Sequence, residues 1–92
     1  MFANLDAVRE ANRRIGHKFF DDEAMLFFKT RIATGIIGGR FFITSEVPPN
    51  GKRKYTVREI LPSGEVITCG EFHRFSTVES AKNWLRRSAD ER

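Results

Sequence analysis

The chain is poor in the residues that most redox, metal and catalytic sites use. It holds one cysteine and two histidines in 92 residues. A single cysteine excludes an internal disulfide bond, which fits a reducing compartment. Cys69 and His73 are spaced closely enough to share a metal, but a closed zinc site requires four ligands, and His17 is the only other histidine. We therefore expect no metal, no cofactor and no disulfide.

Long apolar runs are also missing. No stretch approaches the roughly 20 apolar residues that cross a bilayer. Met1 leads into Asn4 and Asp6, where a signal peptide would carry a basic and then an apolar segment. The sequence therefore predicts a cytoplasmic protein with no membrane partner.

The motifs of catalytic and phosphate-binding sites are absent as well. Nucleophilic catalysis needs a nucleophile held near an oriented base, and neither histidine stands in such a motif. Asp21 and Asp22 are neighbours on a predicted helix, where adjacent side chains do not face one site, so we interpret them as helix-capping residues. The glycine-rich segment 35–39 leads from a helix to a strand, the reverse of a phosphate-binding loop. We therefore expect no enzyme and no small-molecule substrate.

What the chain does contain is typical of one folded domain. Its length supports a single modest core, so we expect one domain over residues 1–92. Hydrophobic residues make up 40% of the chain, with nine phenylalanines. Sixteen Lys and Arg against twelve Asp and Glu give a net charge of +4. Such an excess favours polyanionic partners wherever the cations cluster.

Three segments rich in β-branched and aromatic residues predict an antiparallel meander, with turns supplied by proline and glycine. The predicted strands are residues 40–47, 53–61 and 65–72. Because successive side chains on a strand point to opposite faces, the first strand has two distinct sides. One side carries Phe41, Ile43 and Val47, and the other carries Arg40, Phe42, Thr44 and Glu46.

Helices are predicted before and after this meander in the sequence. Asn4 is a natural N-cap for a first helix that ends at Gly16, with an apolar stripe of Leu5, Val8, Ala11 and Ile15. Asp21 opens a second helix that ends at Gly35, with Lys29 and Arg31 in its last turns, where cations meet the negative pole of the helix dipole. A third helix begins with a capping box of Ser76 and Glu79, and Val78, Ala81 and Leu85 form its predicted buried stripe. The expected fold is α+β, a three-stranded antiparallel meander packed with helices in the order α-α-β-β-β-α.

The side of the meander that carries Arg40 is the candidate binding site. Cations, a hydroxyl and an aromatic ring on one sheet face hold phosphates by charge while the ring stacks on a base. The alternative is a wet sheet face with Lys and Arg that keep the edges from pairing. The candidate residues for binding nucleic acid or another partner are Arg40, Phe42, Lys52, Arg53, Lys54 and Arg58.

Two resemblances extend this interpretation. Segment 55–84, three strands followed by a helix that begins after Phe75-Ser76-Thr77, resembles the sheet-and-helix DNA-binding domain of integrases and plant ethylene-response regulators. With the preceding helix the order is also similar to the double-stranded-RNA-binding fold. Val78-Glu79-Ser80 stands where that family has a basic pattern. The resemblance implies a module that reads duplex DNA with its sheet.

The second resemblance is to small phage and mobile-element proteins of an uncharacterised family. It is carried by Phe19-Phe20, Met25, Phe27-Phe28, Arg31 and segments 42–46 and 55–58. Within that group, proteins of this length are similar to anti-CRISPR proteins that bind a type I RNA-guided surveillance complex. These inhibitors share no motif, so no functional residue is carried over.

The leading hypothesis is a non-enzymatic, phage-type inhibitor that docks on a host CRISPR effector ribonucleoprotein through the basic sheet face and blocks capture of target DNA. Its contacts are to guide RNA, to protein subunits or to DNA. The alternative is a DNA-binding module, a transcription regulator or recombination accessory, whose sheet enters the major groove. A third hypothesis is a small structural protein or enzyme subunit whose basic face is incidental.

Overall fold

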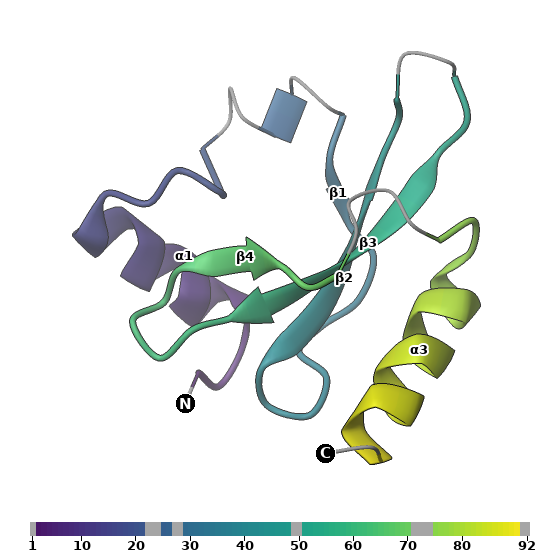
Figure 1. The fold of residues 1–92 in the computed structure, drawn as a ribbon. Helices are drawn as coiled ribbons and strands as arrows, with labels where there is room; N and C mark the ends of the chain where they lie inside the picture. Colours follow the sequence, from purple (N-terminus) through teal and green to yellow (C-terminus); the bar gives the residue numbers. More distant parts are fainter. Residues whose placement is uncertain (1, 22–24, 27–28, 49–50, 71–74, 91–92) are drawn as a thin grey trace.

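A four-stranded antiparallel sheet carries helices on its two faces (Figure 1). The computed structural model describes residues 2–21, 25–26, 29–48, 51–70 and 75–90. The elements are α1 (Leu5–Ile15), β1 (Arg31–Ile32), β2 (Phe41–Glu46), β3 (Lys54–Ile60), β4 (Val66–Thr68) and α3 (Val78–Asp90). The strands are ordered β1-β2-β3-β4 across the sheet.

The predicted order α-α-β-β-β-α, with a three-stranded meander, is wrong: the described elements run α-β-β-β-β-α. The difference lies in the segment assigned to the end of the second helix. Lys29 has a left-handed φ of 51°, and the chain then turns into strand β1, where Arg31 pairs with Ser45 of β2. The N–H of Ala33 donates to the carbonyl of Ile43 at 2.8 Å. Pairing with the free edge of β2 therefore outweighs helix propensity here.

Several predicted features lie outside the described residues. They are Pro49 and Asn50 of the first turn, residues 71–72 of the third predicted strand, His73, and Asp22, Glu23, Ala24, Phe27 and Phe28 of the predicted second helix.

The register of β2 and β3 separates two cores on opposite faces of the sheet. The pairs run from Phe41 with Glu59 to Glu46 with Lys54. On the face covered by α3, Ile43 and Val57 pack against the helix and are fully buried. On the other face Phe42 is fully buried in a core cluster with Val8, Phe20, Ile60 and Val66. Strands with both faces buried explain why residues on either side of the alternation are apolar.

Helix α1 begins and ends as predicted. The Asn4 side chain accepts a hydrogen bond from a first-turn N–H at 3.0 Å, and Gly16 is the left-handed C-cap with φ 75°. The predicted apolar stripe is correct at Val8 but not at Ile15, which is 48% exposed. Asn12 takes the buried position instead. A polar residue is stable there because its amide nitrogen donates to the carbonyls of Val8 and Gly64.

Helix α3 begins one residue later than predicted. The hydroxyl of Thr77, not of Ser76, accepts a hydrogen bond from the Ser80 N–H at 3.1 Å. Both residue types suit an N-cap, so sequence alone does not select between adjacent ones. The predicted buried stripe is confirmed, since Ala81 and Leu85 are buried against the sheet. No helix among the described residues is long and apolar enough to cross a membrane.

The turn between β3 and β4 fixes α1 against the sheet. The Asn12 Nδ2 donates to the carbonyl of Val8 at 3.0 Å and to the carbonyl of Gly64. Gly64 has φ 99°, and a Cβ built there would lie 2.6 Å from the Cβ of Ala11. Glycine is therefore required at this position both for its backbone conformation and for the close approach of the helix.

We expect Gly64→Ala to lower the free energy of unfolding by about 2–4 kcal/mol, because it adds a clash with α1 to the left-handed backbone strain. Urea unfolding followed by circular dichroism measures the change. Gly51→Ala is the matched control, since Gly51 has the same φ of 99° with nothing within 4 Å of its Cβ position. The control should lose only the strain, about 1–2 kcal/mol. Equal losses in both variants would contradict the proposed close packing of α1.

Candidate functional site

The three hairpin cations predicted as site residues stand around the start of β3. Lys52 is exposed, whereas Arg53 and Lys54 are partly buried. The Arg53 Nη1 donates to the Ser45 Oγ at 2.7 Å, and the Lys54 Nζ donates to a hydroxyl near the start of α3 at 3.3 Å. Arg53 therefore leans towards β1, and Lys54 towards α3. Because Arg53 and Lys54 point towards different elements, the three cations do not form one patch.

Arg53 lines a pocket together with Lys29 and Arg31, two cations predicted for the end of the second helix. An open pocket of about 540 Å³ is lined by Met25, Leu26, Lys29, Thr30, Arg31 and Arg53. The Arg53 Nη1 also lies 3.3 Å from the carbonyl oxygen of Lys29 and donates to it. β1 pairing positions Arg31 opposite Ser45, which itself holds Arg53. We call this site the basic pocket; its charged described lining residues are all cations.

Leu26 gives the basic pocket an apolar component. Leu26 is 75% exposed, more than any other large hydrophobic residue in the described part of the chain. Such a side chain beside cations provides contact area for a base or an apolar group of a partner. The basic pocket thus combines positive charge with an apolar surface, two properties that were predicted for the sheet face.

The other three predicted site residues lie elsewhere. Phe42 is fully buried and Arg58 is 8% exposed, so neither presents a contact surface. Arg40 is exposed, stacks on the Phe41 ring at 5.2 Å and forms an ion pair with Glu59. Because Glu59 lies opposite Phe41, Arg40 is at the far end of β2 from the hairpin cations. The expectation that these residues share an uncovered sheet face is therefore wrong.

The sheet face that carries Phe42 and Arg58 holds a buried network of polar side chains. The Arg58 Nη2 lies 3.2 Å from the Glu46 Oε2, and its Nε donates to the Thr44 Oγ1 at 3.0 Å. Its Nη1 donates to the Thr68 Oγ1 at 2.8 Å, and the Thr56 Oγ1 donates to the Glu46 Oε1 at 2.7 Å. Arg58 thus links three strands of the sheet through their side chains.

Aromatic residues that precede β1 lie over this network. The Arg58 guanidinium is 5.1 Å from the centroid of the Phe19 ring, and the Phe19 ring also makes an edge contact with Phe42 at 5.9 Å. Burial lowers the pKa of Arg58, and the neighbouring Glu46 carboxylate partly offsets that effect. The ion pair is therefore a structural contact, and Arg58 is not offered to a partner.

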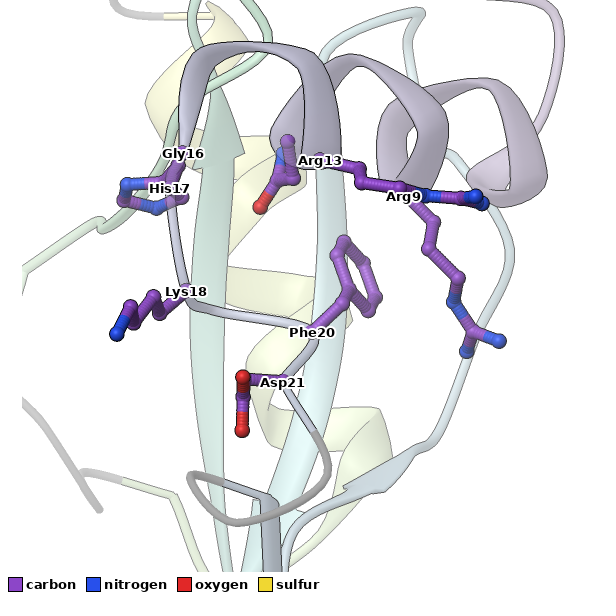
Figure 2. Close-up of a pocket in the computed structure, with 8 residues that line it drawn as sticks. Arg9, Arg13, Gly16, His17, Lys18, Phe20 and Asp21 are labelled. Carbon is purple, nitrogen blue, oxygen red and sulfur yellow. The ribbon is translucent and has the colours of Figure 1, made fainter.

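A second pocket lies where α1 ends (Figure 2). It has a volume of about 320 Å³, and Arg9, Arg13 and Lys18 supply its cations. The Arg9 guanidinium lies 5.3 Å from the centroid of the Phe20 ring, while Lys18 points away from that ring in Figure 2. Within the described part of the chain, the Oδ1 of Asn12 in the pocket wall has no hydrogen-bond partner.

The cations of this second pocket have a sufficient structural explanation. Arg13 forms an ion pair with Glu10 at 2.8 Å and stands in the last turn of α1, and the Arg9 guanidinium is held over the Phe20 ring. Cations at that end complement the negative pole of the helix dipole. In the basic pocket Lys29 likewise follows a helical turn at Met25 and Leu26. Arg31 belongs to β1 and Arg53 precedes β3, so these two cations have no such explanation and are the better candidates for a partner.

The geometry defines the class of the molecule: a small α+β protein with a four-stranded antiparallel sheet, helices on both faces and a basic pocket at one sheet edge. The chain matches the family of unknown function DUF7447 over residues 4–86, and it belongs to that family. No curated protein and no solved structure gives a significant match. The prediction that the chain belongs to an uncharacterised family is confirmed, and its phage origin stays a prediction.

We expect Arg58→Met to lower the free energy of unfolding by about 3–5 kcal/mol, because the Glu46 carboxylate would remain buried without this cation. The double variant Glu46→Gln/Arg58→Met removes both charges and should recover much of the loss. Arg40→Met is the control, since it breaks an ion pair whose arginine side chain is 52% exposed, and it should cost about 1 kcal/mol or less. Urea unfolding measures all three. Similar losses for the two single variants would contradict a structural role specific to the buried pair.

Proposed function

We propose that this protein is a non-enzymatic binding protein whose basic pocket holds a polyanionic partner. The observation that carries the proposal is the convergence of Lys29, Arg31 and Arg53 on one open pocket. These residues come from two separate parts of the chain, and the pairing of β1 with β2 brings them together. Lys52 precedes Arg53 in the chain and is exposed, so it is a neighbouring cation outside the pocket lining.

The side chains of the pocket match the chemistry of a phosphate backbone. Guanidinium groups bind phosphate oxygens through paired hydrogen bonds, while lysine acts as a flexible point charge. Neutralising phosphates releases condensed counterions, which gives an affinity that depends steeply on salt. The net charge of +4 adds long-range attraction to such a partner.

Charge also decides where an inhibitor of an RNA-guided complex would bind. A channel that holds DNA is itself positively charged, so it repels a cationic pocket. Exposed guide RNA attracts the pocket instead. In the phage-type, anti-CRISPR form of the proposal, the protein therefore docks on the nucleic acid of a type I surveillance complex and blocks capture of target DNA by occupying its path.

The duplex-reading alternative has less support from the geometry. It requires a sheet face free to enter the major groove. The face that carries Phe42 and Arg58 is buried, and α3 packs on the opposite face. Duplex DNA is therefore an outcome for the binding experiment to test and not the leading candidate.

We expect a fluorescently labelled single-stranded RNA to bind the wild-type protein with an affinity that falls steeply with salt. Arg31→Glu/Lys52→Glu should weaken binding at least tenfold and reduce the salt slope by about 1.4, the share of two phosphate contacts on a single strand. Arg14→Glu/Arg87→Glu is the control, because it makes the same change in net charge at exposed helix positions. Fluorescence anisotropy measures both. Equal losses in the two double variants would show that only net charge matters and would overturn the site.

A pull-down from host lysate tests the partner. Tagged wild-type protein should retain a multisubunit ribonucleoprotein, and the Arg31→Glu/Lys52→Glu variant should not. Nuclease treatment of the lysate should release the complex if nucleic acid provides the contact. Capture of fragmented duplex DNA without associated RNA would favour the DNA-binding alternative over the inhibitor.

A further inference from the structure

An apolar hollow lies at the opposite end of β2 from the basic pocket. It has a volume of about 360 Å³ and is lined by residues of α3 and of the turn that precedes β2, two segments that lie near each other in Figure 1. Its lining residues are Ile37, Gly38, Phe41, Lys82, Leu85 and Arg86. We call this site the apolar hollow.

The floor of the apolar hollow is held in place by backbone hydrogen bonds. The Ile37 N–H donates to the Phe41 carbonyl at 2.6 Å, and the Phe41 N–H donates to the Ile37 carbonyl at 3.0 Å. Gly38 and Gly39, with φ of 61° and 78°, make this tight turn possible. Leu85 is buried from the helix side. The apolar surface is therefore preformed, which reduces the entropy lost on binding.

The rim of the apolar hollow is cationic. Lys82 and Arg86 are one helical turn apart on α3, so they project on the same side. Arg40 adds a third cation over the ring of Phe41, where its guanidinium is also paired with Glu59. The lining contains no acidic residue among those described. The nearest acidic contact on the helix is Glu79, whose Oε1 lies 3.9 Å from the Lys82 Nζ.

We propose that the apolar hollow is a docking site for an acidic peptide segment of a partner protein, with one leucine or phenylalanine inserted between carboxylates. The apolar floor accepts the inserted side chain, and the cationic rim attracts the flanking carboxylates. A phosphate backbone would satisfy the rim but leave the floor uncovered. A second copy of this chain in a face-to-face arrangement would bring the two cationic rims together, which charge repulsion opposes.

This docking site is independent of the basic pocket. Phe41 begins β2 and Ser45 lies near its end, so the two sites flank the strand and need not compete. A peptide is therefore expected to bind whether or not the polyanion proposal holds, and each site has its own variants.

The probe is a short fluorescent peptide in which a leucine-phenylalanine pair is flanked by aspartates, titrated with the full-length protein in an anisotropy assay. It should bind, and Lys82→Glu/Arg86→Glu should weaken that binding about tenfold or more. Arg14→Glu/Arg87→Glu changes the net charge equally at exposed positions that do not line the hollow, and it should change the affinity less than threefold. Circular dichroism melts confirm that each variant folds.

Two further peptides separate the rim from the floor. Replacing the leucine-phenylalanine pair by serines should abolish binding, and so should replacing the aspartates by lysines. Binding that persists with serines would show attraction by charge alone and overturn the proposal. So would no measurable binding of the parent peptide, or a dimer in sedimentation velocity that Lys82→Glu/Arg86→Glu disperses, since the hollow would then be covered by a second copy.

Discussion

The buried contact between Arg58 and Glu46 is the constraint on which the arrangement of this protein depends. It lies across β2 and β3, on the face of the sheet opposite α3. A charge pair without solvent needs further hydrogen bonds, and the hydroxyls of Thr44, Thr56 and Thr68 provide them. The polar side chains of three strands thus complete one another and fix how those strands align.

This network also decides which cations are available to a partner. Arg58 is enclosed beneath the Phe19 ring, so the middle of the sheet presents no charge. The cations of the two proposed binding sites lie at the two ends of β2: Lys29 and Arg31 near one end, Lys82 and Arg86 near the other. With a rise of about 3.3 Å per residue, the strand between them spans roughly 17 Å. A partner that offers nucleic acid and an acidic segment at that spacing could engage both ends with multiplied affinity.

Sequence patterns predicted the local features of the fold well. The N-cap at Asn4, the stop at Gly16 and the buried stripe of α3 follow from the chemistry of single residues and of helical spacing. Two errors arose where distant contacts decide the outcome. Arg31 was placed on a helix because propensity does not register the free edge of β2. Alternation grouped Phe42 with Arg58 correctly, as the register confirms, but it does not show whether a face is covered.

The candidate site was therefore predicted in part. Lys52, Arg53 and Lys54 stood out as a charge run, but only Arg53 joins Lys29 and Arg31, which had a satisfactory explanation as helix-terminal cations. The signal that connects them is the strand pairing, which no local pattern encodes. In the same way Phe19 stood out only as part of an aromatic pair. Its ring covers Arg58, which had been predicted to contact a partner.

The bond from Asn12 to the Gly64 carbonyl has a consequence for the order of folding. The three strand pairings join segments that are near one another in sequence, so their loops close early and at small entropic cost. The amide of Asn12 reaches a turn 52 residues further along the chain. That turn exists only once the last hairpin has formed. We therefore expect the first helix of the sequence to be the last to dock, so that a ribosome must release most of the chain before the amino-terminal segment finds its place.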